Sequence, residues 1–112
     1  MKKKDTLKKN YEFRKVLTKG KCYYGKYIST YIIKENATSN KIGLAVGKKV
    51  AIAVRRNQIK RWIRECYRAY EHEFKYNCRI VFVLKKDTNI EELDYWKIKE
   101  DLENNFKKAG II

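Results

Sequence analysis

The fold is decided by the stretch Cys78-Arg79-Ile80-Val81-Phe82-Val83-Leu84-Lys85. Its five central residues are all apolar, and a short continuous apolar run is typical of a strand that is buried on both faces. The stretch therefore predicts a central strand, and the neighbouring segments are expected to cover its two faces.

A long helix precedes this strand, beginning near Ala51 and ending at about Phe74. At about 100° per residue, Ile63, Cys66 and Tyr70 fall within about 40° of Ile59 and form an apolar side. Before the helix, residues 41–47 form a strand with Ile42, Leu44 and Val46 on one face. The other face, with Gly43, Ala45 and Gly47, is nearly bare and lets another group approach the backbone closely. A strand, a helix and a buried strand predict a crossover unit.

Two more helices and one more strand complete the pattern. Residues 10–19 form a helix with Asn10 as its N-cap and Gly20 just past its end. Residues 27–34 form a strand rich in aromatic and β-branched residues. Residues 91–109 form the last helix, opened by a capping box of Thr88 and Glu91 and ended at Gly110. We expect one domain over residues 1–112, with residues 1–6 disordered.

The charge balance indicates a polyanionic partner. The chain has 28 Lys and Arg against 13 Asp and Glu, a net charge of +15, and a small domain with so much like charge repels itself unless a polyanion is bound. Residues 1–86 carry a net charge of +18 and residues 87–112 one of −3. No apolar run reaches the roughly 20 residues of a spanning helix, and no signal core follows the basic N-terminus. We therefore expect a cytoplasmic protein that binds nucleic acid and no membrane.

The long helix has a cationic side opposite its apolar one. Asn57, Lys60, Arg61, Arg64 and Arg68 lie between about 100° and 200° from Ile59. A solvated helix face normally mixes signs to gain i,i+4 pairs, yet residues 36–64 contain no acid. The same patch continues into the preceding loop and first turn through Lys48, Lys49, Arg55 and Arg56. This pattern favours phosphate contacts over a passive surface, and exposed aromatic residues beside it would suit single-stranded RNA.

Protein-based catalysis finds little support in the sequence. The three cysteines, Cys22, Cys66 and Cys78, have no zinc-site spacing, and in a reduced compartment they are expected to be free thiols. His72 is the only histidine, which leaves no ordinary catalytic triad or histidine metal site. We expect no catalytic residue on the protein and identify no metal motif.

The run Ala53-Val54-Arg55-Arg56-Asn57-Gln58-Ile59-Lys60-Arg61-Trp62-Ile63-Arg64-Glu65 resembles the arginine–asparagine–arginine signature of the bacterial ribonuclease P protein. Leu7-Lys8-Lys9-Asn10, Phe13, Val16 and Gly20 resemble that family's opening helix. The stretch Gly43-Leu44-Ala45-Val46-Gly47-Lys48-Lys49-Val50 resembles its strand before the signature. The resemblance covers roughly residues 7 to 85. Two positions depart from it: Gln58 replaces the third signature arginine, and Ala51 replaces a glycine.

The resemblance implies a fold, a function and a set of binding residues. The fold is a two-layer α/β (α+β) sandwich, with a mostly antiparallel sheet of about four strands, three helices and a left-handed βαβ crossover. The function is that of the protein subunit of ribonuclease P, an endoribonuclease whose catalytic RNA removes the 5′ leader of precursor tRNA with Mg²⁺ held by the RNA. The implied leader-binding residues are Phe13, Leu17 and Tyr31. The catalytic RNA would contact Lys48, Lys49, Arg55, Arg56, Asn57, Lys60, Arg61, Arg64 and Arg68.

Two other classes of protein compete with this interpretation. A ribosomal or other structural RNA-binding protein would share the basic helix but would need no leader preference. A helix-turn-helix DNA regulator fits poorly, because the basic helix is flanked by strands and not by a short turn from another helix. The expected partners are the catalytic RNA and precursor tRNA, with no obligate protein partner.

Overall fold

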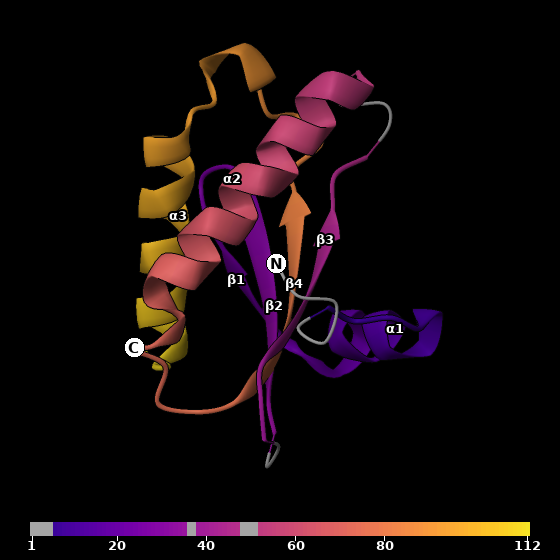
Figure 1. Cartoon of the computed structure of the whole chain (residues 1–112), viewed down its shortest axis with the longest axis vertical. Coiled ribbons are helices and arrows are strands. Elements are labelled where there is room, and N and C mark those ends of the chain that lie inside the picture. Colours follow the sequence, from indigo (N-terminus) through magenta and orange to yellow (C-terminus); the bar gives the residue numbers. More distant parts are fainter. Residues whose placement is uncertain (1–5, 36–37, 48–51) are drawn as a thin grey trace.

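The computed structural model of the protein describes residues 6–35, 38–47 and 52–112. Its helices and strands are interspersed along the chain, with three consecutive strands between the first two α-helices (Figure 1). In chain order they are α1 (Asn10–Lys19), β1 (Lys21–Tyr24), β2 (Ile28–Lys34), β3 (Lys41–Ala45), α2 (Ala53–Glu71), β4 (Cys78–Leu84), the 3₁₀ helix η2 (Ile90–Glu92) and α3 (Tyr95–Ala109).

One mixed sheet organises the molecule, with the strand order β1-β2-β4-β3. β1 pairs with β2 and β2 with β4 in antiparallel fashion, whereas β3 and β4 are parallel. β4 is central as predicted, and Ile80, Val81 and Phe82 are fully buried. The predicted α+β class, with three helices and a sheet of four strands, is confirmed.

α2 connects the parallel strands β3 and β4 through a left-handed crossover. In Figure 1, both strands point upward, β3 lies to the right of β4, and α2 passes in front of the sheet. Such a connection is right-handed in nearly all proteins, so its hand is a distinguishing feature of this fold.

Different helices cover the two faces of the sheet. The larger core lies between the sheet and α2 with α3, and receives Ile28 and Ile32 from β2. α1 covers part of the opposite face, where Val16 packs with Val81 of β4 and with the half-buried Tyr31 of β2. Successive residues of β2 thus face opposite layers, as the geometry of a strand requires.

Several predicted boundaries are wrong, each for a local reason. The last helix starts at Tyr95 and not at Glu91, because the backbone is extended at the buried Leu93. The capping box of Thr88 and Glu91 does not form there: the Asn89 side chain accepts from the Glu91 amide to begin η2, and the Asp94 side chain accepts from the Lys97 amide at 2.8 Å to begin α3.

The ends of the first helices and the N-terminal segment also differ from expectation. Asn10 is the first residue of α1 and not its cap, which is Lys9 without a side-chain hydrogen bond. α2 ends at Glu71 and β3 at Ala45, both short of their predicted ends. Thr6 forms a parallel bridge with Ile42, and residues 1–5 and Ala51 lie outside the described part.

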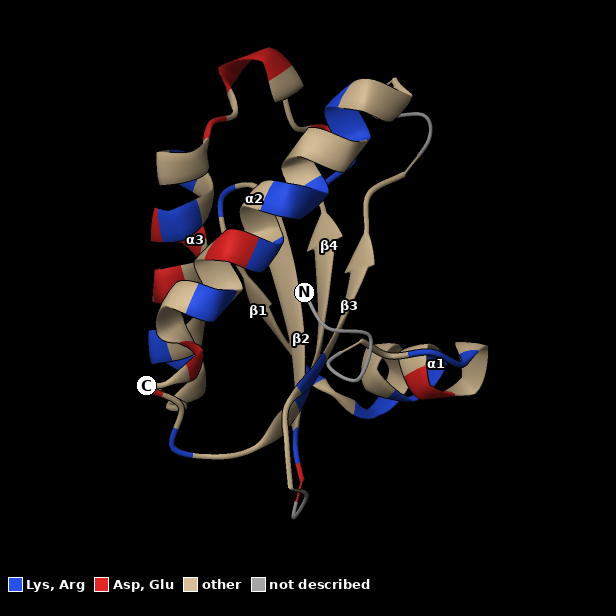
Figure 2. Ribbon diagram, in the orientation of Figure 1, with Lys and Arg blue, Asp and Glu red and all other residues tan. Residues whose placement is uncertain are grey.

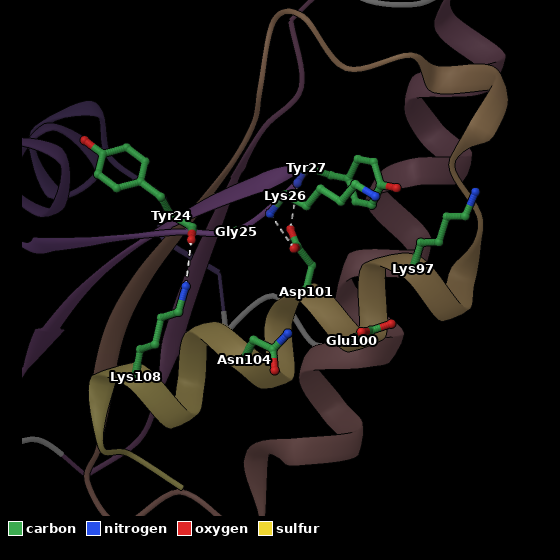
Figure 3. A pocket seen from close by; sticks show the side chains of 9 residues that line it. All are labelled: Tyr24, Gly25, Lys26, Tyr27, Lys97, Glu100, Asp101, Asn104 and Lys108. Carbon is green, nitrogen blue, oxygen red and sulfur yellow. Dashed lines mark hydrogen bonds between the residues drawn. The ribbon is translucent and has the colours of Figure 1, made fainter.

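The turn from β1 to β2 is anchored to α3 by a single carboxylate. Asp101 is only 5% exposed, and its oxygens accept from the backbone amides of Lys26 at 2.6 Å, Tyr27 at 2.9 Å and Ile28 at 2.8 Å (Figure 3). A buried carboxylate that receives three hydrogen bonds fixes the backbone around it. This contact sets the position of the β1 edge of the sheet.

None of the helices in the described part of the chain is long and apolar enough to cross a membrane.

Candidate nucleic-acid interface

The predicted division of α2 into an apolar and a cationic side is present. Ile59, Ile63 and Cys66 are fully buried against the sheet, and blue Lys and Arg bands recur along the helix in Figure 2. We call the opposite side the cationic stripe; Arg61, Arg68 and Asn57 are exposed on it, whereas Lys60 and Arg64 are half-buried. Its residues are Asn57, Lys60, Arg61, Arg64 and Arg68.

The cations of the stripe take part in none of the ion pairs found among the described residues, although Glu65 is an exposed acid on the same helix. Within residues 6–35, 38–47 and 52–112, the ion pairs lie elsewhere: they join Lys15 and Arg79 to Glu35, and Lys107 to Glu103. Four cations on one side of a helix without acidic partners create a positive potential that attracts phosphate. The geometry therefore agrees with the charge pattern that the sequence predicts.

Arg55 does not join the stripe. Its guanidinium donates to the Gln58 side chain, to the carbonyl of Ile90 at 2.6 Å and to that of Leu93 at 3.1 Å. It also lies 5.2 Å from the ring centre of Trp62. These contacts tie η2 to the first turn of α2 and favour a structural role for Arg55 over the RNA contact expected from the family pattern.

The same contacts explain what glutamine does at position 58, where the family signature has an arginine. Gln58 is the acceptor for the Arg55 guanidinium, a role that a second arginine could not take because it has no acceptor atom. The position thus supports Arg55 instead of adding a cation. Arg56 is half-buried at the start of α2, and Lys48 and Lys49 lie outside the described residues.

A pocket of about 180 Å³ lies at the edge of the sheet. Its lining includes residues that were predicted to bind the leader and residues that were predicted to bind the catalytic RNA. We call it the β3-edge pocket. Phe13 of α1 and Lys60 and Arg64 of α2 line it together. Its remaining lining residues are Thr6, Leu7, Ile42, Gly43 and Leu44. An aromatic ring and two cations around one opening are complementary to a base with its phosphate.

Gly43 makes room for Phe13. A Cβ atom at Gly43 would lie 2.6 Å from the Phe13 ring, far closer than van der Waals contact allows. The missing side chain on this face of residues 43–47 thus makes room for an aromatic ring from the neighbouring helix α1. The sequence signals this close approach but does not identify Phe13 as the group that makes it.

Tyr31 and Leu17 lie farther along the same side of the sheet as Phe13. Both are half-buried and pack against the small core beneath α1. Tyr31 of β2 is the pairing partner of Cys22 in the neighbouring strand β1. A hydrogen bond with the Cys22 thiol is the main cause that raises the pKa of Tyr31. The three predicted leader residues therefore share one face but do not line one pocket.

The buried thiols are poor candidates for chemistry. Burial raises the pKa of Cys66 to about 12 and that of Cys78 to about 11, so both stay protonated and weakly nucleophilic near neutral pH. All three cysteines are free, as predicted. Within the described ranges, no group of three or more His, Cys, Asp and Glu side chains is placed to hold a metal ion. The His, Cys, Asp and Glu side chains of the described ranges therefore do not fit a protein-bound magnesium site.

The fold and the site together define a class: small basic α+β proteins with a left-handed crossover whose connecting helix carries a cationic stripe. The family model described as Ribonuclease P matches residues 1–110. The chain belongs to this family, as its motifs predicted, and is a ribonuclease P protein component of the bacterial type. Membership implies a partner RNA subunit and association with an endoribonuclease.

Individual relatives agree along nearly the whole chain. The ribonuclease P protein component of Dictyoglomus turgidum is 39% identical over 110 residues, which are 98% of this chain and 92% of the relative. The RNase P protein from Thermotoga maritima has a TM-score of 0.81 at 28% identity and covers 92% of this chain and 96% of its own. A Staphylococcus aureus RNase P protein mutant with defective mRNA degradation activity has a TM-score of 0.86 at 25% identity, with 98% and 92% covered.

Proposed function

We propose that this protein docks on the catalytic RNA of ribonuclease P through the cationic stripe and holds the 5′ leader of precursor tRNA on the α1 side of the sheet. The observation that carries this proposal is the β3-edge pocket, whose lining combines Phe13 with Lys60 and Arg64. A leader nucleotide at this point would stack on the ring while the catalytic RNA is bound by the adjacent stripe. The proposed role is positioning, and the cytoplasm is its expected compartment.

Magnesium enters this proposal through the RNA. The described residues present no suitable ligand cluster, so no step is assigned to a metal on the protein. Mg²⁺ bound by the RNA would supply the chemistry and screen the two crowded RNAs from each other. The protein's cations contribute to the same screening, so its benefit should be largest when Mg²⁺ is scarce.

Reconstitution with the catalytic RNA tests this function. At low Mg²⁺, adding the protein to ribonuclease P RNA from the same genome should increase cleavage of the leader from precursor tRNA, because it supplies cations and holds the leader. The measurement is single-turnover cleavage of end-labelled precursor tRNA. Retention of the RNA without any gain in cleavage would instead support a structural RNA-binding protein.

The protein alone is the necessary control in that experiment. We expect it to cleave no RNA, since the family's chemistry resides on the RNA subunit. An mRNA substrate belongs in the control, because an mRNA degradation activity is described for the S. aureus protein. Cleavage of precursor tRNA by carefully purified protein without RNA would contradict the proposed division of labour.

Phe13→Ala and Tyr31→Ala should each weaken binding of precursor tRNA by about 1–3 kcal/mol, the usual value for one stacked base. Mature tRNA lacks the leader, so its binding to the same holoenzyme should be unchanged. Phosphate contacts occur throughout both substrates, so a charge effect would instead weaken both. The comparison is made by equilibrium binding of the two RNAs, after each variant is shown to melt cooperatively.

Two further variants sharpen the Phe13 experiment. Gly43→Ala keeps the ring but displaces it, because the new Cβ would lie 2.6 Å from it, and should reproduce part of the selective loss. Tyr11→Ala removes a ring that is 68% exposed on the same helix and should have no effect. Equal weakening of both tRNAs by Phe13→Ala and Tyr31→Ala would argue that these rings serve only the core.

A further inference from the structure

The strand register aligns residues into rows across the α1 side of the sheet. One row consists of Gly43, Val81, Tyr31 and Cys22, which are consecutive pairing partners on β3, β4, β2 and β1. Phe13 lies against the Gly43 end of this row. The next row toward the β1–β2 turn consists of Ala45, Val83, Ser29 and Tyr24. We call it the second row.

The second row has small side chains along most of its length and a large exposed ring at its end. Ala45 and Val83 are half-buried and Ser29 is 7% exposed, whereas Tyr24 is 64% exposed. Three strand spacings of about 4.8 Å separate Ala45 from Tyr24, so the row is about 14 Å long. Tyr24 is therefore the one large side chain of the second row.

The Tyr24 ring is exposed at the β1 edge of the sheet. Its side chain points away from Asp101 and the α3 side of the β1–β2 turn (Figure 3), while its carbonyl accepts from the Lys108 ammonium at 3.1 Å. A hydrogen bond with the Cys22 thiol is the first cause that raises the pKa of Tyr24, as it is for Tyr31. Cys22, which ends the first row, therefore lies between Tyr31 of its own row and Tyr24 at the end of the second row.

A cation accompanies the exposed ring. The Lys85 ammonium lies 6.0 Å from the Tyr24 ring centre, at the end of β4 next to the second row. An exposed aromatic ring beside an ammonium group suits single-stranded RNA. The base stacks on the ring, and the phosphate pairs with the cation. Acidic side chains are absent from the second row itself, so nothing in it repels phosphate.

We propose that Tyr24 is an additional stacking surface for the 5′ leader, which crosses the second row from the β3-edge pocket to the β1 edge. This inference rests on the proposed function, because the leader must first occupy the α1 side. The leader nucleotide nearest the cut lies by the catalytic RNA and thus by α2. Tyr24, at the far edge of the sheet, then receives a nucleotide more distant from the cut than those at Phe13 and Tyr31.

Leaders of increasing length provide the test. Binding of the wild-type holoenzyme to precursor tRNAs should strengthen in steps as the leader grows, and Tyr24→Ala should remove only the last step. Its affinity for long leaders should fall about 5- to 150-fold, as expected for one stacked base, with short leaders unaffected. Tyr24→Phe keeps the stacking face and should bind long leaders like wild type.

A second exposed tyrosine supplies a matched control. Tyr76 is 49% exposed and has the Lys34 ammonium 4.7 Å from its ring centre, but it lies outside both rows. If Tyr24→Ala matches Tyr76→Ala at every leader length while Phe13→Ala stays selective for the leader, the role of Tyr24 is wrong and the proposed function stands. A wild-type holoenzyme without any leader preference would overturn both.

Discussion

Replacing Lys60, Arg61 and Arg64 together by glutamine should weaken binding of the protein to the catalytic RNA by about a hundred- to a thousandfold at about 0.1 M salt. Each cation that neutralises a phosphate adds slightly less than one unit to the slope of log affinity against log salt. Three lost contacts should lower that slope by about two to three. Glutamine keeps the helix propensity high, so α2 should remain folded. The measurement is equilibrium binding across a salt series.

A second triple variant separates local contacts from net charge. Lys75, Lys86 and Lys107 are exposed and lie outside the cationic stripe, so replacing them by glutamine removes the same charge. Its salt slope should change far less, because long-range attraction is screened within about 10 Å at 0.1 M salt. Equal losses in both triples would mean that only net charge matters. An unchanged slope in the first triple would show that the stripe is a passive surface.

Asp101→Ala should lower the free energy of unfolding by about 3 kcal/mol. The carboxylate accepts from three consecutive backbone amides, and hydrogen bonds to a charged group are among the strongest in proteins. Its removal leaves these donors without a protein partner and frees the turn before β2. Urea unfolding followed by circular dichroism measures the effect.

Glu100 is the natural control for Asp101. It is an exposed acid on the same helix beside the same turn, so Glu100→Ala removes an equal charge and should change stability by less than about 0.5 kcal/mol. Asp101→Asn should fall between the two, since one acceptor oxygen is kept and an amide donor replaces the other. A loss below about 1 kcal/mol in Asp101→Ala would show that water replaces the carboxylate at the turn.

The sequence predicts this fold well in the segments where the hydrophobic pattern extends over many residues. The continuous apolar run of β4 and the two-sided pattern of α2 place the central strand, the crossover helix and the cationic stripe correctly. β1 escapes detection because Lys21-Cys22-Tyr23-Tyr24 is too short to establish an alternation and follows directly on α1. The start of α3 shifts because burial of Leu93 outweighs the local capping signal.

The candidate site is less predictable than the fold, because it depends on contacts between distant segments. Phe13 meets Gly43 across 30 positions of sequence, and no local pattern encodes that approach. Arg55 belongs to the basic signature by position, yet the carbonyl groups of Ile90 and Leu93 hold its guanidinium on another side of the helix. Charge patterning identifies which helix is cationic; tertiary packing decides which cations remain on the stripe.

The strand order has a consequence for how the chain folds. β4 pairs with β2 and β3, but β3 and all of α2 intervene between β2 and β4 in sequence. The central sheet therefore assembles only after a distant segment is captured, and such non-local pairing is slow. Until then the apolar run of β4 is exposed, which makes partly folded chains prone to aggregate. A refolding protocol for this protein should accordingly favour dilute conditions, and a slow late phase should coincide with burial of β4.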